Sequence, residues 1–577
     1  MDPYHIEGGR REPGFKAYNH RDHMSRQFWR RTPRLTKVVY ALMLSGLGTI
    51  CYLSLFSSRN EARFPLGTDE GTGTGSETTY LEADVQKQEA IVDAFKHAWN
   101  SYEQDAMGDD EYHPMSHRGS NLSLSGGIGY TVVDAIDTMQ IMSLKSEYSR
   151  ARQWIKSTLT FERQGNFNTF ETTIRVLGGL LSAYHLSQDQ LFLERADDLG
   201  SRLLTAFSTS SGLPLPMADL ARRVGVPDQW SAWQVSTAEA ATLQLEFRYL
   251  AELTGNQDYW YKAEKVMEVI HKALPPHHLV PITMDANTGT FTQSEIRLGS
   301  RGDSYYEYLL KQYLQTNRTE PIYKEMYHDS MQGLHDKLVH KTPTKHMTYI
   351  AELLPSGGSY TLSHKQDHLV CFLAGSLMLG ATTVGAIDGN VSVPPRMEEL
   401  TPQGQRDWNT GVELLETCVH TYNGSETGLS PEIAMFHTER PTTGNRDWYI
   451  KGAQRGGPAS YDARYMLRPE TVESVFLAWR LTGDTRYRDY AWRIFSAIEK
   501  HCRLPKGGYA TVLDVDNLPV RHLDKQETFF MSETLKYLYL TFSDSSVISL
   551  KDHVFNTEAH PIPIFKPTIK PAFPSSP

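Results

Sequence analysis

The chain has 577 residues, a formal net charge of −10 and a pI near 6.1. Hydrophobic residues make up 40% of the chain and aromatic residues 11%, which is enough to bury a large core. Proteins that bind nucleic acids usually carry a basic stripe that neutralises phosphates. The dense basic region here is confined to the N-terminal arm, so the composition argues against nucleic acid as a partner.

An uncharged segment of 19 residues, 38–56, follows that arm. Its length matches the roughly 20 residues with which a helix crosses a bilayer. The 17 residues before it hold six Lys or Arg and the 17 after it hold two, so the positive-inside rule places the N-terminus in the cytosol. We therefore expect a cytoplasmic tail at 1–37, a transmembrane signal anchor at 38–56 and a lumenal chain beyond it. A buried core helix is the alternative for 38–56, and the polar flanks disfavour it.

The segment 57–84 contains the run DEGTGTGSETT, which has few apolar residues, and we expect a flexible lumenal stem there. From residue 85 the pattern becomes helical, because Ile91, Phe95 and Trp99 form one apolar stripe. Four later segments share one pattern, an apolar helix followed by a short turn and a second, amphipathic helix. Their turns lie near Ser187, Thr254, Thr316 and Thr482.

Recurrence on this scale indicates repeated helical hairpins. Strand signals are sparse and occur mainly in connections, such as residues 278–293 and 507–515. The expected fold class is all-α. Helical hairpins would close into a barrel over residues 85–567, with minor β-hairpins and a short tail at 568–577.

Carboxylates recur at equivalent places in these hairpins. An acid lies 12 to 16 residues before each of the four turns, near the start of the first helix, and a fifth acid begins a later helix. These acids are Glu171, Glu239, Asp303, Glu470 and Glu533. If the first helices all run in one direction around an inner ring, the acids collect at one mouth of the barrel. Helix capping and compensation of the helix dipole are the alternative reason for an acid in a first turn.

Two features favour a binding site over capping. The acids stand among apolar and aromatic residues, and Arg175, Arg301 and Arg468 lie close to them in the sequence. Carboxylates and arginines bind hydroxyl groups, and aromatic faces stack on sugar rings, so such a mouth suits a polyol. Two acids can also perform glycoside hydrolysis.

A lumenal location gives meaning to sequons and cysteines. Four N-x-S/T sequons are candidate glycosylation sites, at Asn121, Asn317, Asn390 and Asn423. Cys51 lies in the expected anchor. The three lumenal cysteines, Cys371, Cys418 and Cys502, allow one disulfide and one free thiol.

Eight longer motifs carry a resemblance to a known family. They are GYTVVDAIDTM (129–139), FETTIRVLGGLLSAY (170–184), AEAATLQLEF (238–247), SRGDSYYEYLLK (300–311), DHLVCF (367–372), LRPETVESVF (467–476), ETFFMSETLKYLYL (527–540) and VFNTEAHP (554–561). Over residues 85–567 the chain closely resembles the class I α-1,2-mannosidases, glycoside hydrolase family 47. The resemblance implies an (α/α)7 barrel and hydrolysis of α-1,2-linked mannose with inversion of configuration. It also implies high-mannose N-glycans as substrates and Ca²⁺ as cofactor.

The same motifs assign roles by resemblance. Glu171 resembles the general acid, Glu470 resembles the general base that activates water, and Asp303 resembles the third catalytic carboxylate, whose share of the work is open. Thr557 resembles the residue that binds calcium through its hydroxyl and carbonyl oxygens, with water and sugar hydroxyls completing the shell. Positions that match residues lining the site or holding its waters are Arg175, Glu239, Arg301, His368, Arg468, Glu473, Phe529, Glu533 and Glu558.

The resemblance also bears on disulfide pairing and specificity. Cys371 and Cys418 match the family's disulfide pair, which leaves Cys502 as the free thiol. Arg301 resembles the endoplasmic reticulum type, whereas Golgi-type members carry an apolar residue there. We therefore expect removal of one middle-branch mannose from the nine-mannose glycan in the endoplasmic reticulum membrane. A Golgi-type enzyme that removes several mannoses is the alternative. A degradation factor that binds mannose without hydrolysing it is disfavoured, because the proposed catalytic residues and Thr557 are intact.

Overall fold

The computed structural model describes residues 80–229, 233–440, 446–453 and 457–573. They belong to one compact unit, Ser76–Pro577. The expected cytoplasmic tail, the expected anchor at 38–56 and most of the expected stem lie outside the described residues. Among the residues that are described, no helix combines the length and the apolar character that a membrane span requires.

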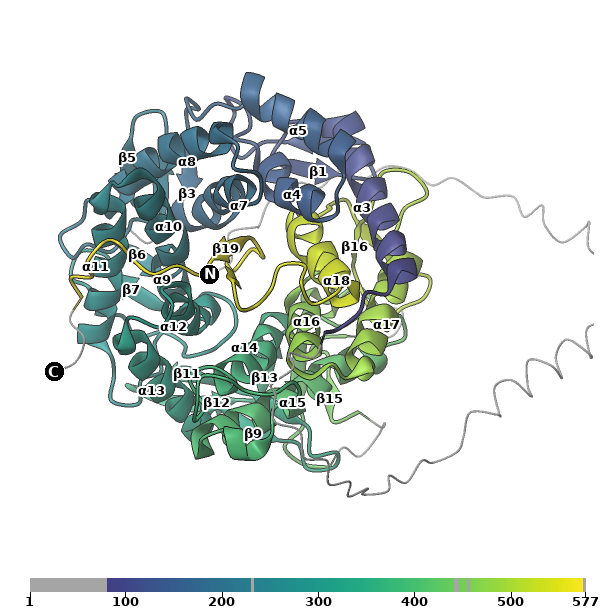
Figure 1. The fold of residues 1–577 in the computed structure, drawn as a ribbon. Helices are drawn as coiled ribbons and strands as arrows, with labels where there is room; N and C mark the ends of the chain where they lie inside the picture. The colour runs from purple at the N-terminus through teal and green to yellow at the C-terminus, as the bar shows by residue number, and fades with distance from the viewer. Residues whose placement is uncertain (1–79, 230–232, 441–445, 454–456, 574–577) are drawn as a thin grey trace, which may run out of the picture. The chain divides into compact units, whose positions relative to one another are not determined.

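Seven inner helices of the described chain form a closed ring (Figure 1). Each contacts the next, and the π-helical turn η6 (Phe530–Thr534) before the last one contacts the first, so the ring closes. The inner helices are α4 (Tyr130–Ile141), α7 (Gly178–Ser187), α10 (Gln244–Thr254), α12 (Asp303–Gln315), α14 (Phe372–Ala381), α16 (Glu470–Thr482) and α18 (Leu535–Phe542). Besides η6, shorter segments precede three of the other inner helices, namely α6 (Thr169–Glu171) with η1 (Thr172–Leu177), α9 (Thr237–Ala241) and η3 (His368–Cys371).

Seven outer helices cover this ring, each packed on an inner partner. They are α3 (Val85–Ala106), α5 (Lys145–Ser157), α8 (Gln190–Leu203), α11 (Gln257–Ala273), α13 (Pro321–Lys337), α15 (Pro402–Asn423) and α17 (Thr485–His501). From α4 onward the chain alternates between inner and outer helices, and α3 packs on α18. The expected barrel of seven helical hairpins is therefore confirmed for the described residues.

The hairpin turns explain why the sequence pattern repeats. Gly255 ends α10 in the left-handed conformation, with φ 72°, and its amide bonds to the Ala251 carbonyl. Asn256 then caps α11 by accepting a hydrogen bond from the Asp258 amide at 3.1 Å. The pairs Gln188 with Asp189 and Gly483 with Asp484 repeat this arrangement. A tight turn of this kind reverses the chain, so these three outer helices run antiparallel to their inner partners, as expected for a barrel whose inner helices begin at one end.

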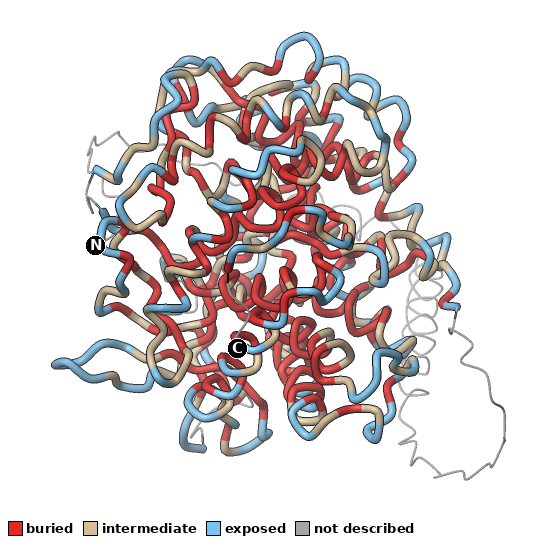
Figure 2. The backbone as a smooth tube through the Cα atoms, turned by 60° about the vertical axis from the view of Figure 1, so that its left-hand side comes forward, coloured by how far each residue is buried: buried red, intermediate tan, exposed pale blue. Residues whose placement is uncertain are grey.

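Burial follows the same two layers (Figure 2). In α12 nearly every side chain is buried, because the helix lies between its inner neighbours, an outer helix and the barrel interior. In α5, by contrast, the buried residues are Ala151 and Ile155. A helix that is covered on all sides carries apolar residues all round, whereas a surface helix carries one apolar stripe.

Short antiparallel sheets lie in the connections between the helices. The strands are β1 (Glu111–His113), β2 (Arg118–Ser120), β3 (Asn166–Asn168), β4 (Met217–Asp219), β5 (Val224–Val226), β6 (Gln234–Ser236), β7 (Thr283–Asp285), β8 (Thr290–Phe291), β9 (Val339–Lys341), β10 (Thr348–Ile350), β11 (Glu352–Ser356), β12 (Ser359–Ser363), β13 (Lys365–Asp367), β14 (Ile433–Phe436), β15 (Trp448–Tyr449), β16 (Thr511–Val512) and β17 (His522–Leu523). Three of the sheets have three strands, in the orders β3-β4-β5, β6-β7-β8 and β13-β14-β15. The strands β3, β6 and β13 lead directly into α6, α9 and η3, so these sheets hold the starts of three inner segments.

A last hairpin, β18 (His553–Phe555) with β19 (Pro561–Pro563), lies inside the ring (Figure 1). It contacts the inner helices α7, α10 and α12. Residues 556–560 connect its strands, and we call them the central turn. The chain then leaves the barrel along its outside, where Thr568 donates to Glu252 and the Ala572 amide donates to Glu264 at 2.8 Å.

Candidate active site

The acids predicted from the repeats lie at the N-terminal ends of the inner segments. Glu171 ends α6, Asp303 begins α12 and Glu470 begins α16, while Glu239 lies in α9 and Glu533 lies in η6. Electrostatic interactions link them in series, from Glu239 to Glu171, Glu558, Glu533, Glu470 and Asp303. The structure therefore brings the predicted acids together at one mouth of the barrel.

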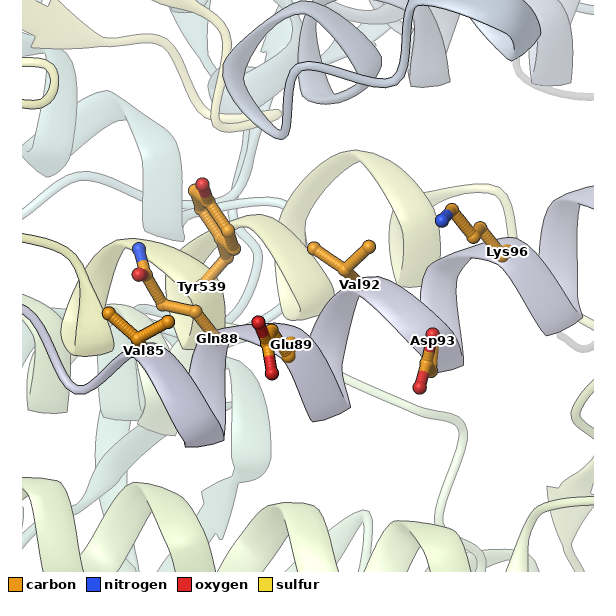
Figure 3. Close-up of a pocket in the computed structure, with 7 residues that line it drawn as sticks. All are labelled: Val85, Gln88, Glu89, Val92, Asp93, Lys96 and Tyr539. Carbon is orange, nitrogen blue, oxygen red and sulfur yellow. The ribbon is translucent and has the colours of Figure 1, made fainter.

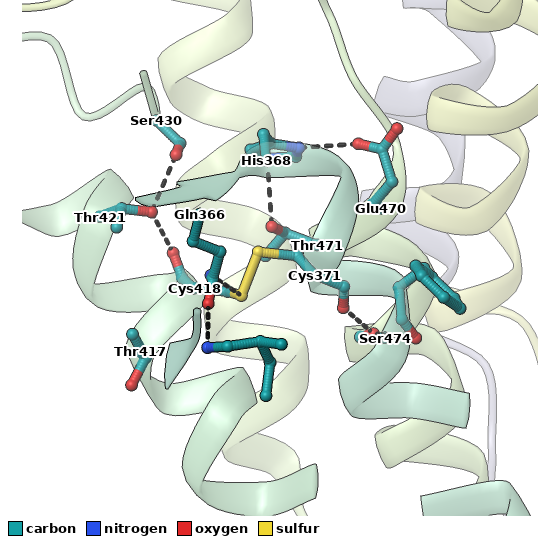
Figure 4. The surroundings of a disulfide bond; sticks show 12 residues. Gln366, His368, Cys371, Thr417, Cys418, Thr421, Ser430, Glu470, Thr471 and Ser474 are labelled. Atoms are coloured by element: carbon teal, nitrogen blue, oxygen red, sulfur yellow. Dashed lines mark hydrogen bonds and ion pairs between the residues drawn. A yellow bond between two sulfur atoms is a disulfide. The ribbon is translucent and has the colours of Figure 1, made fainter. Parts of the chain in front are cut away.

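Glu470 is buried but keeps its charge. The Nδ1 atom of His368 lies 2.7 Å from its Oε2 atom (Figure 4), and Arg468 Nη1 lies 3.9 Å from its Oε1 atom. Burial by itself raises the pKa of Glu470, but the hydrogen bond and charge of His368, together with the charge of Arg468, lower the pKa overall. A carboxylate that stays ionised at neutral pH can accept a proton from water.

Arg468 is fixed by a second acid, Glu432. Its Nε atom lies 2.7 Å from Glu432 Oε2 and its Nη2 atom lies 2.6 Å from Glu432 Oε1. Such a two-point contact holds the guanidinium plane rigidly. The Phe529 ring lies 5.8 Å from the guanidinium carbon of Arg468 and the same distance from that of Arg175, so both arginines are close to this ring.

Glu171 is paired with the other of these arginines, Arg175. Arg175 donates from Nε to Glu171 Oε2 at 2.8 Å and pairs with the buried Glu558. The Glu171 side chain is 37% exposed, whereas that of Glu470 is 12% exposed. Each of the two acids therefore has its own arginine, Arg175 for Glu171 and Arg468 for Glu470, and both arginines lie near the Phe529 ring.

A cavity of about 530 Å³ opens at this mouth. Its walls include Tyr130, Asn168, Glu171, Arg175, Arg468 and Phe529. Carboxylate, guanidinium and amide groups alternate there with aromatic faces, the combination that binds sugar hydroxyls and sugar rings. A second hollow, of about 340 Å³, lies between α3 and α18, where Val85, Val92 and Tyr539 meet charged side chains (Figure 3). It contains none of the predicted site residues.

Asp303 and Glu239 hold protons more tightly than ordinary carboxyls. Burial, followed by the charges of Glu307 and Glu470, raises the pKa of Asp303 to about 7. Burial and the charge of Glu171 raise the pKa of Glu239 to about 7, although Arg301 opposes the shift. A low pKa at Glu470 beside a high pKa at Asp303 separates a base from a proton-bearing acid.

The central turn brings Thr557 and Glu558 beneath this mouth. Thr557 donates from Oγ1 to Glu307 Oε2 at 2.9 Å, and its amide donates to the Tyr308 hydroxyl at 3.2 Å. Asn556 closes the turn, since its Oδ1 accepts from the amides of Glu558 and His560 at 2.9 and 2.8 Å. Thr557 thereby lies within the barrel, beside a carboxylate of α12.

The surrounding carboxyls suit an oxygen-bound cation. Burial and then Glu558 raise the pKa of Glu533 well above its usual range, and burial raises the pKa of Glu473 to about 8 although Lys311 opposes it. Several acids crowded in a low dielectric lose protons more easily when a divalent ion is present. In the described part of the chain no three His, Cys, Asp or Glu side chains form a direct metal cluster. A site with Thr557 as its one protein ligand residue does not require such a cluster.

The helices deviate from regular geometry at the site. Both η1, which carries Arg175, and η6, which carries Glu533, are π-helical turns inside inner segments. Three residues other than glycine adopt positive φ nearby, namely Arg301 at 70°, Leu467 at 63° and Ala559 at 58°. Such features cost free energy and concentrate at functional sites.

Several site residues were missed by the reasoning from hairpin spacing. Asp134 and Asp137 of α4 are fully buried, and His560 of the central turn lies between them, at 3.1 Å from Asp134 Oδ1 and 2.8 Å from Asp137 Oδ2. Lys536 completes the cluster by donating to the Ala559 carbonyl at 2.7 Å. All of these residues lie inside the motifs named above. The signal that could have revealed them is the pair of acids, Asp134 and Asp137, in the otherwise apolar helix GYTVVDAIDTM.

The disulfide prediction is confirmed. Cys371 of η3 and Cys418 of α15 are bonded (Figure 4), and Cys502 is a buried free cysteine. The bond anchors the segment that begins with His368. The four sequon residues Asn121, Asn317, Asn390 and Asn423 are all exposed, and their glycosylation stays a prediction.

Comparison with known proteins agrees with this geometry. The family model of glycosyl hydrolase family 47 matches residues 94–564. A mannosyl-oligosaccharide 1,2-alpha-mannosidase of Arabidopsis thaliana is 42% identical over 88% of this chain and 85% of its own length. An endoplasmic reticulum mannosyl-oligosaccharide 1,2-alpha-mannosidase of Schizosaccharomyces pombe is 42% identical over 84% of this chain and 91% of its own length. The solved structure of an alpha-1,2-mannosidase from Trichoderma reesei has a TM-score of 0.72 at 28% identity, covering 84% of this chain and all of that one. The chain therefore belongs to glycosyl hydrolase family 47.

Proposed function

We propose that this chain hydrolyses terminal α-1,2-linked mannose from high-mannose N-glycans with inversion of configuration. The similar proteins of Arabidopsis thaliana and Schizosaccharomyces pombe carry the name of that activity. The single observation that carries the proposal is the separation of protonation states at one mouth. Glu470 is held ionised by His368 and Arg468, while the pKa of Asp303 is raised to about 7.

The mechanism uses the residues in fixed roles. Glu470 removes a proton from a water molecule, whose oxygen attacks the anomeric carbon of the terminal mannose. The glycosidic carbon–oxygen bond breaks, and Glu171, directly or through a water, gives its proton to the departing oxygen of the next sugar. Arg175 orients the Glu171 carboxyl through the 2.8 Å hydrogen bond from Nε. Asp303 is the third carboxylate, and its raised pKa favours a protonated form that donates a hydrogen bond in the site.

A calcium ion would be held by the Oγ1 and carbonyl oxygens of Thr557. Glu473, Glu533 and Glu558 would orient its waters. When bound, the ion would take mannose hydroxyl oxygens as ligands and would thereby help to hold the sugar ring in a reactive conformation. The chain's own contribution is the central turn, which presents Thr557 next to Glu307 at 2.9 Å.

Specificity is proposed to depend on Arg301, which is exposed at the mouth. Its guanidinium would clamp one branch of the glycan and restrict cleavage to a single middle-branch mannose of the nine-mannose substrate. A Golgi-type pattern, with several mannoses removed, is the competing outcome. The name of the relative from Schizosaccharomyces pombe favours the endoplasmic reticulum as location, and we propose a type II orientation with the barrel in the lumen.

The decisive experiment incubates the purified chain with the nine-mannose glycan and follows the released sugar by NMR before mutarotation. Release of β-mannose is expected for an inverting enzyme. Release of α-mannose would reverse the roles proposed for Glu171 and Glu470. Binding of the glycan without any release would instead identify a mannose-binding factor. The identity of the first mannose removed separates the endoplasmic reticulum pattern from the Golgi pattern.

A further inference from the structure

The loop that carries Arg301, residues 296–303, is built to a tight geometry. Arg301 has a φ of 70°, a left-handed conformation that is unfavourable for a residue with a side chain and persists only where its surroundings enforce it. A Cβ atom at Gly302 would lie 2.2 Å from the Arg297 carbonyl oxygen, so the chain passes over itself there without room for a side chain. The Arg297 Nε atom also donates to the Ser300 carbonyl at 2.8 Å.

The two ends of this loop are attached to different parts of the barrel. At its start, Ile296 exchanges two backbone hydrogen bonds of 2.9 Å with Leu353 of β11. At its end, the Arg301 carbonyl accepts from the Ala238 amide at 3.0 Å and from the Ser236 hydroxyl at 3.3 Å. Ser236 also accepts from the Glu239 amide at 3.2 Å, so the backbone of Arg301 is tied to the start of α9.

Asp367 holds the middle of the loop. Its carboxylate accepts from the Ser300 amide at 3.4 Å and packs against Gly299, where a Cβ atom would lie 2.5 Å from the Asp367 Oδ2 atom. The other carboxylate oxygen pairs with Lys365, which in turn donates to Glu352 at 2.9 Å. Asp367 is 5% exposed and Glu352 is 3% exposed, so this ion group is built into the wall of the mouth.

No role in the proposed mechanism uses Asp367, although it opens the DHLVCF motif and directly precedes His368. We propose that Asp367 is a positioning residue that fixes the Arg301 loop and thereby the discrimination that Arg301 makes among the terminal mannoses of the glycan. The proposal rests on the proposed function. Its physical basis is that a clamp discriminates only if its guanidinium is held in place before the substrate arrives.

The test is a double-mutant cycle on product selectivity. The four proteins are wild type, Asp367→Ala, Arg301→Leu and the double variant. The readout is the ratio of the rate of removal of the first mannose to that of the second. Asp367→Ala should lower this ratio by about tenfold, the effect of losing one hydrogen bond to a charged group. In the Arg301→Leu background it should change the ratio by less than about twofold, because the residue that Asp367 positions is gone.

The ratio is a property of active molecules, so partial unfolding of a variant does not change it. Asp367→Asn provides a second variant that keeps the side-chain volume and weakens the contacts to Lys365 and Ser300. It should give a smaller loss of selectivity. It should also speed hydrogen exchange of a peptide covering 296–303, with exchange in α12 unchanged. The absolute rate is not the readout, because the charge of Asp367 also contributes to the raised pKa of Asp303.

Asp462→Asn is the matched control. Asp462 interacts electrostatically with the same Lys365 and Asp367, but it lies outside the Arg301 loop, and its backbone amide donates to the Ser460 hydroxyl at 3.3 Å. It should leave the product ratio unchanged. An equal shift in Asp462→Asn, an unchanged ratio in Asp367→Ala, or an equal loss in both Arg301 backgrounds would each overturn the proposal. Failure of the proposed function itself is distinguishable, because wild type would then release no mannose, or Arg301→Leu would leave the order of release unchanged.

Discussion

Replacing Glu470 by glutamine tests its proposed role as the base without changing the geometry of the site. The substitution keeps the shape of the side chain and removes its negative charge and basicity. Arg468 should stay in place, because its two contacts to Glu432, at 2.6 and 2.7 Å, do not involve Glu470. Substrate affinity should therefore change by less than about threefold, while kcat falls by about 10²–10⁴, the usual contribution of a general base.

The structure gives a second consequence of this change. The charge of Glu470 is one of the causes that raise the pKa of Asp303, after burial and Glu307. Removing that charge should lower the pKa of Asp303. His368→Asn is the graded control, since it removes the 2.7 Å hydrogen bond but leaves the carboxylate. It should lower kcat by about tenfold and move the acidic limb of the pH profile to higher pH, because His368 lowers the pKa of Glu470.

The assay combines steady-state kinetics on the nine-mannose glycan with calorimetric binding of the same glycan. A loss confined to kcat shows an interaction made in the transition state, whereas a matching loss of affinity shows uniform binding. Retention by Glu470→Gln of more than a tenth of wild-type kcat would refute the assignment of the base. A loss of binding as large as the loss of kcat would refute the claim that the site survives the substitution.

Four further predictions follow from the same geometry. Glu171→Gln should lose activity on the glycan by at least about 10²-fold but act normally on α-mannosyl fluoride, whose leaving group needs no proton, and equal losses on both substrates would remove Glu171 as proton donor. Chelation by EDTA should abolish activity and lower Tm. If Thr557 holds the ion, calcium at about 100 times its Kd should raise the free energy of unfolding again by roughly 2.7 kcal/mol. An unchanged Tm in chelator would contradict the site. In the chelated protein, Asp303 and Glu239 have pKa values of about 7, whereas carboxyls of the unfolded chain titrate near 4. The free energy of unfolding should therefore fall as pH rises from 5 to 7, by up to about 1.4 kcal/mol per pH unit for each carboxyl. A Tm that rises over that range would contradict this prediction. Protease added to sealed microsomes should spare the barrel, and its complete digestion would exclude a lumenal location.

The helical part of the fold was predictable because its signals are local. A residue in the left-handed conformation followed by an Asx cap, as in Gly255 and Asn256, marks three of the hairpin turns within a few residues of sequence. Fixed spacing from those turns then placed the acids at the inner-helix starts. The sheets that support three of these starts were mostly missed. Strands of three residues such as β3 and β6 are too short to show alternation of polar and apolar side chains.

The roles of individual residues depended on recognising the motifs. Nothing local in the sequence shows that Arg175 meets Glu558, 383 residues later, or that His560 meets Asp134 across 426 residues. Such contacts exist only once the barrel has closed and the chain end has returned into it. Spacing can place a carboxylate on a helix face, but the pKa differences that separate Glu470 from Asp303 arise from neighbours on other hairpins.

The central turn explains why site and barrel should behave as one cooperative unit. In the described chain it is hydrogen-bonded to five of the seven inner segments. The contacts are to Asp137 of α4, Ile174 of η1, Glu246 of α10, Glu307 of α12 and Lys536 of α18. A change that loosens the barrel would therefore displace Thr557 and Glu558, and an ion held at Thr557, as proposed, would stabilise the helices around it. If the proposed calcium site is correct, stability and calcium affinity should be linked through this turn, because a ligand that binds only the closed barrel shifts the folding equilibrium by the free energy of its own binding.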